Sequence, residues 1–182
     1  MAHYKYLLIG GGMTAASAIG GIRELDANGA ISVITAETNP PYDRPPLSKA
    51  LWTGKKTVAE IMRLTPAGVN FHLGRTAKDL NLAGKKITDD RGVAHTYDKL
   101  LLATGGTPRR LPFGGDAIIY FRTLADYQRL RELARQHDTF AVIGGGFIGS
   151  EIAAALAMNG KKVSLITPDS GICARLFPAD VV

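Results

Sequence analysis

Short apolar runs that end in a glycine turn dominate the hydrophobic pattern of the chain. The segments YLLIGGGMTAASAI (6–19) and FAVIGGGFIGSEIA (140–153) each combine an apolar run, three glycines and a helix of small residues. A second apolar run follows each of them, AISVITAE (30–37) and KKVSLITPD (161–169). Strand, tight turn, helix and strand in this order are typical of a βαβ unit with parallel strands. The repeat therefore predicts two nucleotide-binding domains of one type.

Between the two units the pattern changes to short runs that are typical of β-strands. Turn signals at Gly84 and at residues 90–92 separate some of these runs. The runs are GVNFHLG (68–74), AKDLNL (77–82), KKITDD (85–90), GVAHTYD (92–98) and KLLLATGG (99–106). They predict an antiparallel meander that returns to a buried strand at Leu100–Ala103.

A linker and a helix are expected before the second unit. The segment TPRRLPFGGD (107–116) is rich in proline and glycine, which is typical of a linker. In TLADYQRLRELARQH (123–137) apolar residues recur at helical spacing, and Thr123 is the expected N-cap. These elements predict an α/β fold.

The segment PPYDRPPLSK (40–49) has four prolines within seven residues. Proline fixes φ and has no N–H group, so the segment is excluded from a central strand and from a helix interior. We expect a stiff, extended loop that carries Arg44 and Lys49. Trp52 follows it, either packed beside a ligand or as an anchor in the core.

Composition and charge narrow the classes of function. Hydrophobic residues make up 46% of the 182 positions, enough for one core or for one domain and part of another. The net charge of +6 comes without a long basic run, which disfavours nucleic-acid binding and leaves an anionic cofactor or an acidic protein partner. The single cysteine, Cys173, allows no internal disulfide, which predicts a reducing, cytoplasmic location. No segment reads as a secretory leader or a membrane span.

The two glycine turns, GGGMTA (10–15) and GGGFIG (144–149), have the spacing of a dinucleotide-binding motif. The first glycine permits a tight turn, the second lets a pyrophosphate approach the backbone, and the third small residue lets helix and strand pack closely. The pyrophosphate then lies at the positive end of the helix dipole. An acidic residue about 20 positions later binds a ribose hydroxyl, and Glu37 and Asp169 occupy these places. Asp169 favours NAD over NADP, whereas the nearby Arg175 points the other way.

Several motifs together resemble the FAD-dependent pyridine-nucleotide oxidoreductases. Within that superfamily the resemblance is to the ferredoxin and rubredoxin reductases and to apoptosis-inducing factor with its bacterial relatives. The motifs are LIGGGMTAA, PYDRPPLSKALW, ATGGTPR (103–109), VIGGGFIGSE and TPDSG. The resemblance implies a Rossmann-like FAD-binding domain with an antiparallel meander, whose N-terminal part is residues 1–112. Residues 113–182 are then a linker and an incomplete Rossmann-like NAD(P)H-binding domain.

The resemblance implies a set of FAD-binding residues in the first half of the chain. The pyrophosphate is expected against Gly10, Gly12, Met13, Thr14 and Ala15.

For the rest of FAD the same resemblance implies separate contacts. Glu37 binds the adenosine ribose, and the backbone near Ala77 meets the adenine. Arg44 and Lys49 touch the flavin side, Thr104 and Gly105 lie in the cofactor-binding ATGGTPR segment, and Arg109 pairs with an FAD phosphate.

The second half is expected to hold NAD and to complete the reactive site. The resemblance places NAD against Gly145, Gly146, Phe147 and Ile148, with Asp169 on its ribose and Arg175 near its adenosine half. Glu151 pairs with Lys49 near the reactive edge of the flavin.

Lys49 and Glu151 are the two residues expected to be catalytic, and both have a plainer interpretation. In the catalytic interpretation, the fixed positive charge of Lys49 favours electron density arriving on the flavin ring. Lys49 is otherwise an ordinary solvated lysine that caps a short helix, and Glu151 a surface charge on a helix. The neighbouring motifs favour the catalytic roles.

These features predict a flavoprotein oxidoreductase that transfers a hydride from NADH to FAD and passes electrons to an external acceptor. Disulfide reductases carry a redox cysteine pair soon after the first unit, where this chain has prolines and no cysteine. The expected acceptor is therefore a small redox protein, ferredoxin or rubredoxin, or a quinone-like compound. One alternative is an NADH-responsive redox sensor or scaffold resembling apoptosis-inducing factor. Another is a folded chain that holds no cofactor.

The length of the chain is the feature that fits the resemblance least. A complete protein of this plan needs about three domains, on the order of 400 residues. Residues 1–182 are therefore expected to be an N-terminal fragment, and a homodimer is left open for the complete protein. No metal site is expected, because the histidines lack metal-ligand spacing; they are His3, His72, His95 and His137.

Overall fold

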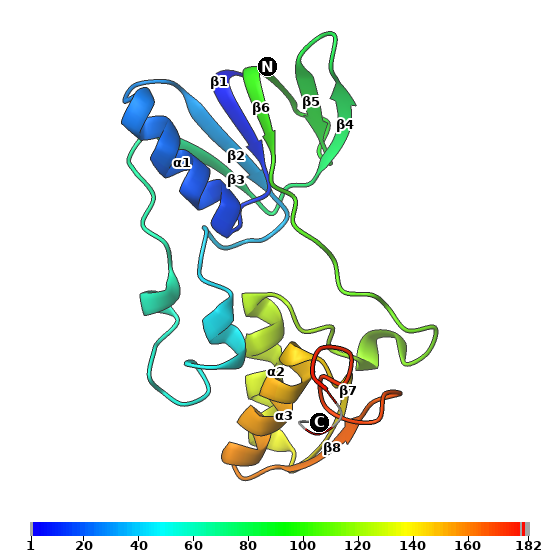
Figure 1. The fold of residues 1–182 in the computed structure, drawn as a ribbon. Helices are drawn as coiled ribbons and strands as arrows, with labels where there is room; N and C mark the ends of the chain where they lie inside the picture. Colours follow the sequence, from blue (N-terminus) through cyan, green and yellow to red (C-terminus); the bar gives the residue numbers. More distant parts are fainter. Residues whose placement is uncertain (1, 179, 181–182) are drawn as a thin grey trace. The chain divides into compact units, whose positions relative to one another are not determined.

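The chain folds as two compact units in a computed structural model that describes residues 2–178 and 180. The first unit contains the chain up to Asp43 together with Met62–Gly106. The second contains Arg44–Ile61 and the chain from Thr107 onward. The proline-rich segment is thus divided between the units at Asp43. Figure 1 shows both units in the colours of the sequence. The predicted domain boundary after residue 112 stays a prediction.

A mixed six-stranded sheet with the order β3-β2-β1-β6-β5-β4 forms the first unit. Strands β1, β2, β3 and β6 are parallel, and β4, β5 and β6 form an antiparallel meander. The elements are β1 Ala2–Ile9, α1 Met13–Leu25, β2 Ile31–Thr35, β3 Val69–Leu73, β4 Ala77–Asn81, β5 Lys86–Asp89 and β6 Ala94–Leu102. The mixed sheet confirms the predicted α/β class with its meander.

Two details of the predicted meander were wrong. The run 68–74 forms β3, which pairs in parallel with β2 instead of joining the meander. All five residues of β2 are buried, so this strand lies inside the sheet with a neighbour on each edge. The runs 92–98 and 99–106 do not form two strands, because β6 continues through the junction. The junction between the two runs is Asp98 and Lys99. It contains neither glycine nor proline to turn the chain there.

Both faces of the parallel strands are covered. Helix α1 lies along one face, where Ala15 and Ile19 pack against Leu8, Ile31 and Val33 (Figure 1). On the opposite face, buried side chains of the parallel strands pack against buried side chains of the meander. This cluster contains Tyr4, Leu7, Ile9, Ile34, Ile87 and Tyr97. Strand β1 is thus buried from both sides, because its alternating side chains enter both cores. This fixes the carboxyl end of β1, where the first glycine turn begins.

A buried polar cluster lies on the meander side of the first unit. The carboxylate of Asp89 is 3.3 Å from Nε2 of His95 and 3.3 Å from Nη1 of Arg75. The rings of His95 and His72 are 4.6 Å apart between centroids, and Nε2 of His72 is 3.2 Å from the hydroxyl of Tyr4. Asp89 is almost fully buried, so its charge depends for compensation on the guanidinium of Arg75 and on the contact with the buried His95.

This cluster predicts that acid destabilises the first unit. Burial, followed by the neighbouring His95 and Arg75, lowers the pKa of His72. A histidine with a lowered pKa binds more protons when unfolded, so its stabilisation is present above its unfolded pKa of about 6.5 and is lost as the pH falls below that value. Urea unfolding between pH 7.5 and 5 measures the effect. His72→Gln should weaken the dependence of stability on pH, and an equally steep dependence in this variant would show that His72 is not its source.

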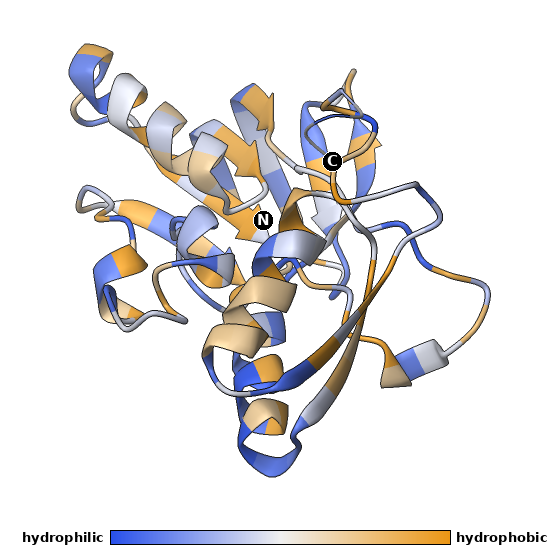
Figure 2. Cartoon of the chain, turned by 60° about the horizontal axis from the view of Figure 1, so that its bottom comes forward, coloured by the Kyte–Doolittle hydropathy of each residue, from blue (hydrophilic) through white to orange (hydrophobic). Residues whose placement is uncertain are grey.

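The second unit is built from two helices and a two-stranded parallel sheet. Its elements are α2 Leu124–Gln136, β7 Thr139–Ile143, α3 Phe147–Met158 and β8 Lys162–Ile166, with short 3₁₀ helices at Pro45–Ser48, Ala59–Ile61 and Gly115–Ala117. Most of α3 has hydrophobic colours in Figure 2. The predicted N-cap is confirmed, because Thr123 and Asp126 form a reciprocal capping box at the start of α2.

The proline segment is folded into the second unit by buried aromatic side chains. Trp52 is 5% exposed, and its Nε1 donates to the carbonyl of Leu47 at 2.9 Å. The ring meets Tyr127 edge-on, with centroids 5.7 Å apart, and the guanidinium of Arg131 lies 4.9 Å from its centroid. The Tyr127 hydroxyl donates to the carbonyl of Leu51 at 3.2 Å. Of the two interpretations of Trp52, the core anchor is the one found.

The expectation of an extended loop was wrong for part of this segment. Pro45–Ser48 forms a 3₁₀ helix with prolines at its first two positions. Proline suits a helix start, because its fixed φ is helical and the N–H groups of the first turn have no intrahelical partner. The prolines therefore fix a short helical turn directly before Lys49.

Candidate functional site

The first glycine turn joins β1 to α1 and leaves no room for side chains at its start. Gly10 has a φ of +105°, and a Cβ atom there would lie 2.1 Å from the carbonyl oxygen of Ala103. Its N–H donates to the carbonyl of Ile34 at 2.8 Å, so the turn is tied to β2. Only glycine combines a positive φ with the absence of a Cβ atom, so only glycine fits at this position. Gly12 then serves as the N-cap of α1 in extended conformation.

The start of α1 is suited to an anion. The first N–H groups of a helix have no intrahelical acceptor, and here neither the N-cap nor the first turn brings an acidic side chain. Of the predicted contacts, Thr14 is exposed and Met13 half-buried, whereas Ala15 is fully buried in the core against the sheet. A pyrophosphate fits this backbone cradle, and Ala15 supplies the close packing that the motif requires.

The predicted adenosine-binding residues lie at the same edge of the first unit. The half-buried Glu37 follows β2 and accepts a hydrogen bond from the hydroxyl of Tyr42, which is 3% exposed. After β3, the N–H of Gly74 donates to the carbonyl of Glu37 at 3.0 Å, and the N–H of Arg75 to that of Thr35 at 2.8 Å. The chain then enters β4 at Ala77. Glu37 and the backbone leading to Ala77 are therefore neighbours, as a shared adenosine site requires.

Glu37→Ala is expected to weaken FAD binding by about tenfold or more, a loss of about 1.4 kcal/mol, because it removes the carboxylate for which a ribose contact is predicted and which Tyr42 holds in place. Tyr42→Phe should weaken it less, since the carboxylate stays but is no longer held in place. Titration of the purified variants with FAD, followed by flavin fluorescence, measures both affinities. Equal affinity of wild type and Glu37→Ala would rule out the ribose contact.

The residues that directly follow β6 also contact the first glycine turn. The N–H of Ala103 donates to the carbonyl of Ile9 at 2.8 Å, and Cα of Thr104 is among the atoms nearest to a Cβ placed on Gly10. Gly105 follows with a φ of +69°. Thr104 and Gly105 are exposed beside the turn, and their contact with the cofactor stays a prediction.

Two predicted FAD contacts belong to the second unit. Arg44 caps the 3₁₀ helix and donates through Nη1 to the carbonyl of Arg122 at 2.9 Å. Arg109 is exposed in the irregular segment after Gly106. Their predicted contacts with FAD stay predictions.

The second glycine turn, between β7 and α3, repeats the geometry of the first. Gly144 has a φ of +115°, and its N–H donates to the carbonyl of Ile166 at 2.8 Å. A Cβ atom on Gly149 would lie 1.9 Å from the carbonyl oxygen of Gly144, so the third glycine of the motif is required for packing. Gly145 is buried against Thr167, and Gly146, the N-cap of α3, is exposed.

The remaining predicted NAD residues lie around this turn. Phe147 and Ile148 are 56% and 49% exposed at the start of α3. Asp169 pairs with Arg175, whose Nε is 3.0 Å from its carboxylate. The predicted ribose and adenosine contacts are thus partners of each other. Cys173 is buried with a φ of +56°, and its N–H donates to the carbonyl of Gly145 at 2.7 Å, so its backbone supports the turn.

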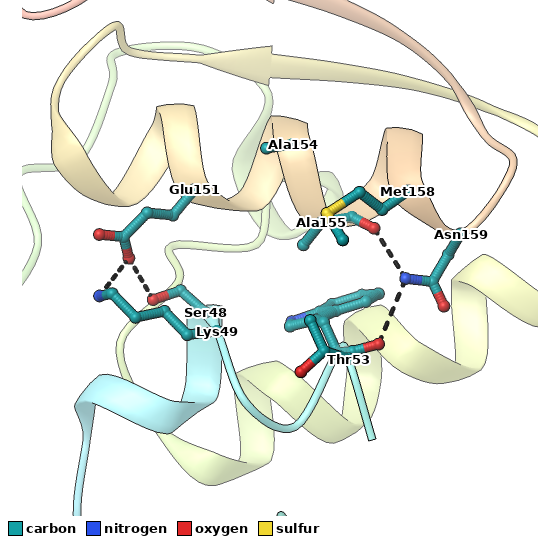
Figure 3. Close-up of a pocket in the computed structure, with 9 residues that line it drawn as sticks. Ser48, Lys49, Thr53, Glu151, Ala154, Ala155, Met158 and Asn159 are labelled. Atoms are coloured by element: carbon teal, nitrogen blue, oxygen red, sulfur yellow. Dashed lines mark hydrogen bonds and ion pairs between the residues drawn. The ribbon is translucent and has the colours of Figure 1, made fainter. Parts of the chain in front are cut away.

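The predicted ion pair of Lys49 and Glu151 is present within the second unit (Figure 3). Nζ of Lys49 donates to Oε2 of Glu151 at 2.8 Å, and Oγ of Ser48 donates to the same oxygen at 2.5 Å. Burial raises the pKa of Glu151, but the hydrogen bonds from Lys49 and Ser48 and the charge of Lys49 outweigh it and lower the pKa. Glu151 is therefore ionised near neutral pH, and Lys49 keeps a charged partner.

A small, mainly apolar pocket borders this pair in Figure 3. It is lined by Ser48, Lys49, Trp52, Thr53, Glu151, Ala154, Ala155, Met158 and Asn159. Its volume of about 180 Å³ is below the roughly 300–1,000 Å³ of typical small-molecule sites. We therefore assign it no cofactor.

Within residues 2–178 and 180, no group of three or more His, Cys, Asp or Glu side chains is placed to hold a metal ion. In the same part of the chain, no helix has the length and the apolar character needed to cross a bilayer.

Two contributors to the site had no role in the sequence-based prediction. Tyr42 fixes the carboxylate of Glu37, and Ser48 bonds the carboxylate of Glu151. Both lie in the motif PYDRPPLSK, which was the available signal. A buried hydroxyl, however, gives no indication in the sequence of the residue to which it donates.

Comparison with known proteins places these features in a family. The model of the family described as "Pyridine nucleotide-disulphide oxidoreductase" matches residues 4–181. The 5,5'-dehydrodivanillate O-demethylase ferredoxin reductase subunit of Sphingobium sp. is 38% identical over 97% of this chain and 45% of its own length. Apoptosis-inducing factor 1 of Dictyostelium discoideum is 35% identical over 96% of this chain and 38% of its own length.

A solved structure gives the same result. The reductase in the covalent putidaredoxin reductase–putidaredoxin complex is similar with a TM-score of 0.87 and 28% identity, over 100% of this chain and 46% of that one. The chain spans less than half the length of each of these three proteins. The two glycine turns, the mixed sheet and the family match along nearly the whole sequence show that the chain belongs to the pyridine nucleotide-disulphide oxidoreductase family.

Proposed function

We propose that this chain contributes the FAD-binding turn and the NADH-binding turn of a flavoprotein reductase that passes electrons to an external acceptor. The observation that carries the proposal is the repeat of one glycine-turn geometry, with a φ of +105° at Gly10 and +115° at Gly144. Each turn opens a helix and has an acidic residue after the next strand. One such turn binds one dinucleotide, so two turns suit a pair of them.

Each part of the proposed site has a defined task. The turn at Gly10, with Glu37 and the backbone before Ala77, binds the pyrophosphate and adenosine of FAD. The turn at Gly144 binds the pyrophosphate of NADH. When bound, FAD supplies the redox chemistry, accepting a hydride and releasing electrons. The protein contributes alignment and a fixed charge, the Lys49 ammonium held by a carboxylate.

The proposed acceptor is a small redox protein, ferredoxin or rubredoxin, or a quinone-like compound. The similarity to a ferredoxin reductase subunit and to putidaredoxin reductase supports the first choice. The net charge of +6 suits an acidic protein partner. With a single cysteine, the chain suits electron transfer without a protein thiol pair, in a reducing compartment such as the cytoplasm.

A second candidate is an NADH-responsive sensor or scaffold, which the 35% identity with apoptosis-inducing factor 1 supports. The two candidates differ in the fate of the reduced flavin. Rapid reoxidation by ferredoxin or rubredoxin favours the reductase. A long-lived reduced complex with NAD and a changed oligomeric state favours the sensor.

Lys49→Ala is expected to slow flavin reduction by NADH by roughly tenfold or more, the order of effect of removing one preorganised charged group. FAD affinity should change little, because Lys49 is 55% exposed and belongs to the other compact unit from the glycine turn at Gly10. Anaerobic stopped-flow absorbance on the FAD-loaded chain measures the rate, with Lys55→Ala as the control from the same segment. Equal rates in Lys49→Ala and wild type would remove Lys49 from the proposed chemistry.

A further inference from the structure

We propose that Ser48 is a positioning residue of the reductase site: it fixes the carboxylate of Glu151, which in turn fixes the ammonium group of Lys49. The inference rests on the proposed function and adds to it the residue that keeps the charged pair in place. The sequence pattern draws attention to Lys49 and Glu151, which are charged, rather than to the neutral residue beside them.

The contacts around one oxygen atom support this order of dependence. Oε2 of Glu151 accepts both hydrogen bonds, from Oγ of Ser48 at 2.5 Å and from Nζ of Lys49 at 2.8 Å (Figure 3). Ser48 is 4% exposed, whereas the side chains of Lys49 and Glu151 are 55% and 25% exposed. Of the two donors, the hydroxyl is the buried one.

Burial and side-chain length decide which donor sets the geometry. An ion pair with an exposed lysine is weakened by solvent, and it requires a flexible four-carbon chain to be held in one conformation. A buried hydroxyl on a single rotatable bond loses little freedom, and its short bond to a carboxylate is of the strong, charge-assisted kind. Ser48 therefore fixes Glu151, and Lys49 follows the fixed carboxylate.

The backbone that carries Ser48 is itself fixed. Pro45 and Pro46 start the 3₁₀ helix, and the N–H of Lys49 closes it on the carbonyl of Pro46 at 3.1 Å. Leu47 is 2% exposed, and its carbonyl accepts the indole N–H of Trp52. The hydroxyl thus projects from a rigid turn, as a positioning residue requires.

The helix that carries Glu151 is also held in place by packing. Glu151 lies in the first half of α3, where the buried Ile152 and Ala155 pack the helix into the core. The carboxylate therefore meets the hydroxyl between two elements that are each fixed by their own packing.

The first experiment follows the titration of Glu151 directly in the chain without cofactor. Carbon-13 NMR of labelled glutamate carboxyl groups gives the midpoint, and Glu151→Gln identifies the signal by its loss. Ser48→Ala should shift the midpoint of Glu151 to higher pH, because the carboxylate loses a charge-assisted donor. The matched control is Thr53→Val, which removes a hydroxyl of the same segment that donates to the carbonyl of Ala50 instead. It should leave the midpoint unchanged.

A second variant, Ser48→Cys, tests the same contact should Ser48→Ala fail to fold. Ser48→Cys keeps the size of the side chain but replaces the hydroxyl with a weak donor, so it should also raise the midpoint. Far-ultraviolet circular dichroism establishes that each variant is folded. A midpoint that is the same in wild type, Ser48→Ala and Ser48→Cys would overturn the assignment.

The second experiment separates this inference from the proposed function. In the FAD-loaded chain, Ser48→Ala should lower the rate of flavin reduction by NADH several-fold, in the same direction as Lys49→Ala. Absence of reduction in wild type would reject the proposed function, while the titration still decides the role of Ser48. A shifted midpoint with an unchanged rate would overturn the positioning role in the reaction.

Discussion

Gly10→Ala is expected to abolish FAD binding and to lower the free energy of unfolding of the first unit by about 3 kcal/mol or more. Two costs act together at this position. The backbone has a φ of +105°, which side-chain-bearing residues rarely adopt, and the added Cβ would lie 2.1 Å from the carbonyl oxygen of Ala103. Relief requires β1 and the end of β6 to separate, which opens the cradle.

The control for this prediction comes from the helix that the turn begins. Gly20 lies within α1, and a Cβ there meets no atom within 4 Å. Gly20→Ala should therefore stabilise the chain by about 0.5–1 kcal/mol, because alanine favours a helix interior over glycine. Urea unfolding and FAD titration of the two variants test the contrast. Wild-type stability and FAD affinity in Gly10→Ala would refute the close approach on which the proposed FAD site depends.

The second large effect is expected at the glycine turn between β7 and α3. Substitution of one glycine there should affect folding, and substitution of another should affect NADH binding. Gly149→Ala would place a Cβ 1.9 Å from the carbonyl oxygen of Gly144 and should unfold or strongly destabilise the second unit. Gly146 has an ordinary φ of −79°, and a Cβ there meets no atom within 4 Å. Gly146→Ala should therefore change stability by no more than about 1 kcal/mol.

Binding should behave differently from folding in Gly146→Ala. The added methyl group occupies the backbone surface that a pyrophosphate approaches, so NADH affinity should fall by about tenfold or more, equivalent to about 1.4 kcal/mol. Thermal unfolding and NADH titration, carried out on the same preparation, distinguish the two effects. An NADH affinity equal to that of wild type would place the pyrophosphate elsewhere.

The sequence predicted the local elements better than their pairing. The glycine turns and the capped helix after Thr123 follow from local rules, and the structure contains them. The place of β3 does not follow from such rules, because VNFHL suits a parallel or an antiparallel neighbour equally, and only the buried β2 decides. The unbroken β6 changes partner direction along its length, which the alternation of its residues does not reveal.

In the candidate site, too, local sequence rules identified single residues but not the long-range contacts between them. Residues carried by a motif, such as Gly10 and Gly144, were identified from spacing. The bond between Ser48 and Glu151 joins residues 103 positions apart and depends on the packing of the 3₁₀ helix near α3. The helical turn was expected only in the plainer interpretation of Lys49, as the cap of a short helix, because a proline run predicts extended chain and a helix start equally well.

Binding of FAD and its reduction by NADH can be observed together in a visible absorption spectrum of the purified 182-residue chain after incubation with FAD and desalting. NADH is then added under anaerobic conditions. We expect a retained flavin with a protein-shifted spectrum that NADH bleaches, and neither property in folded Gly10→Ala. A chain that is folded by circular dichroism but neither retains FAD nor changes its fluorescence in a direct titration would contradict the proposed cofactor site.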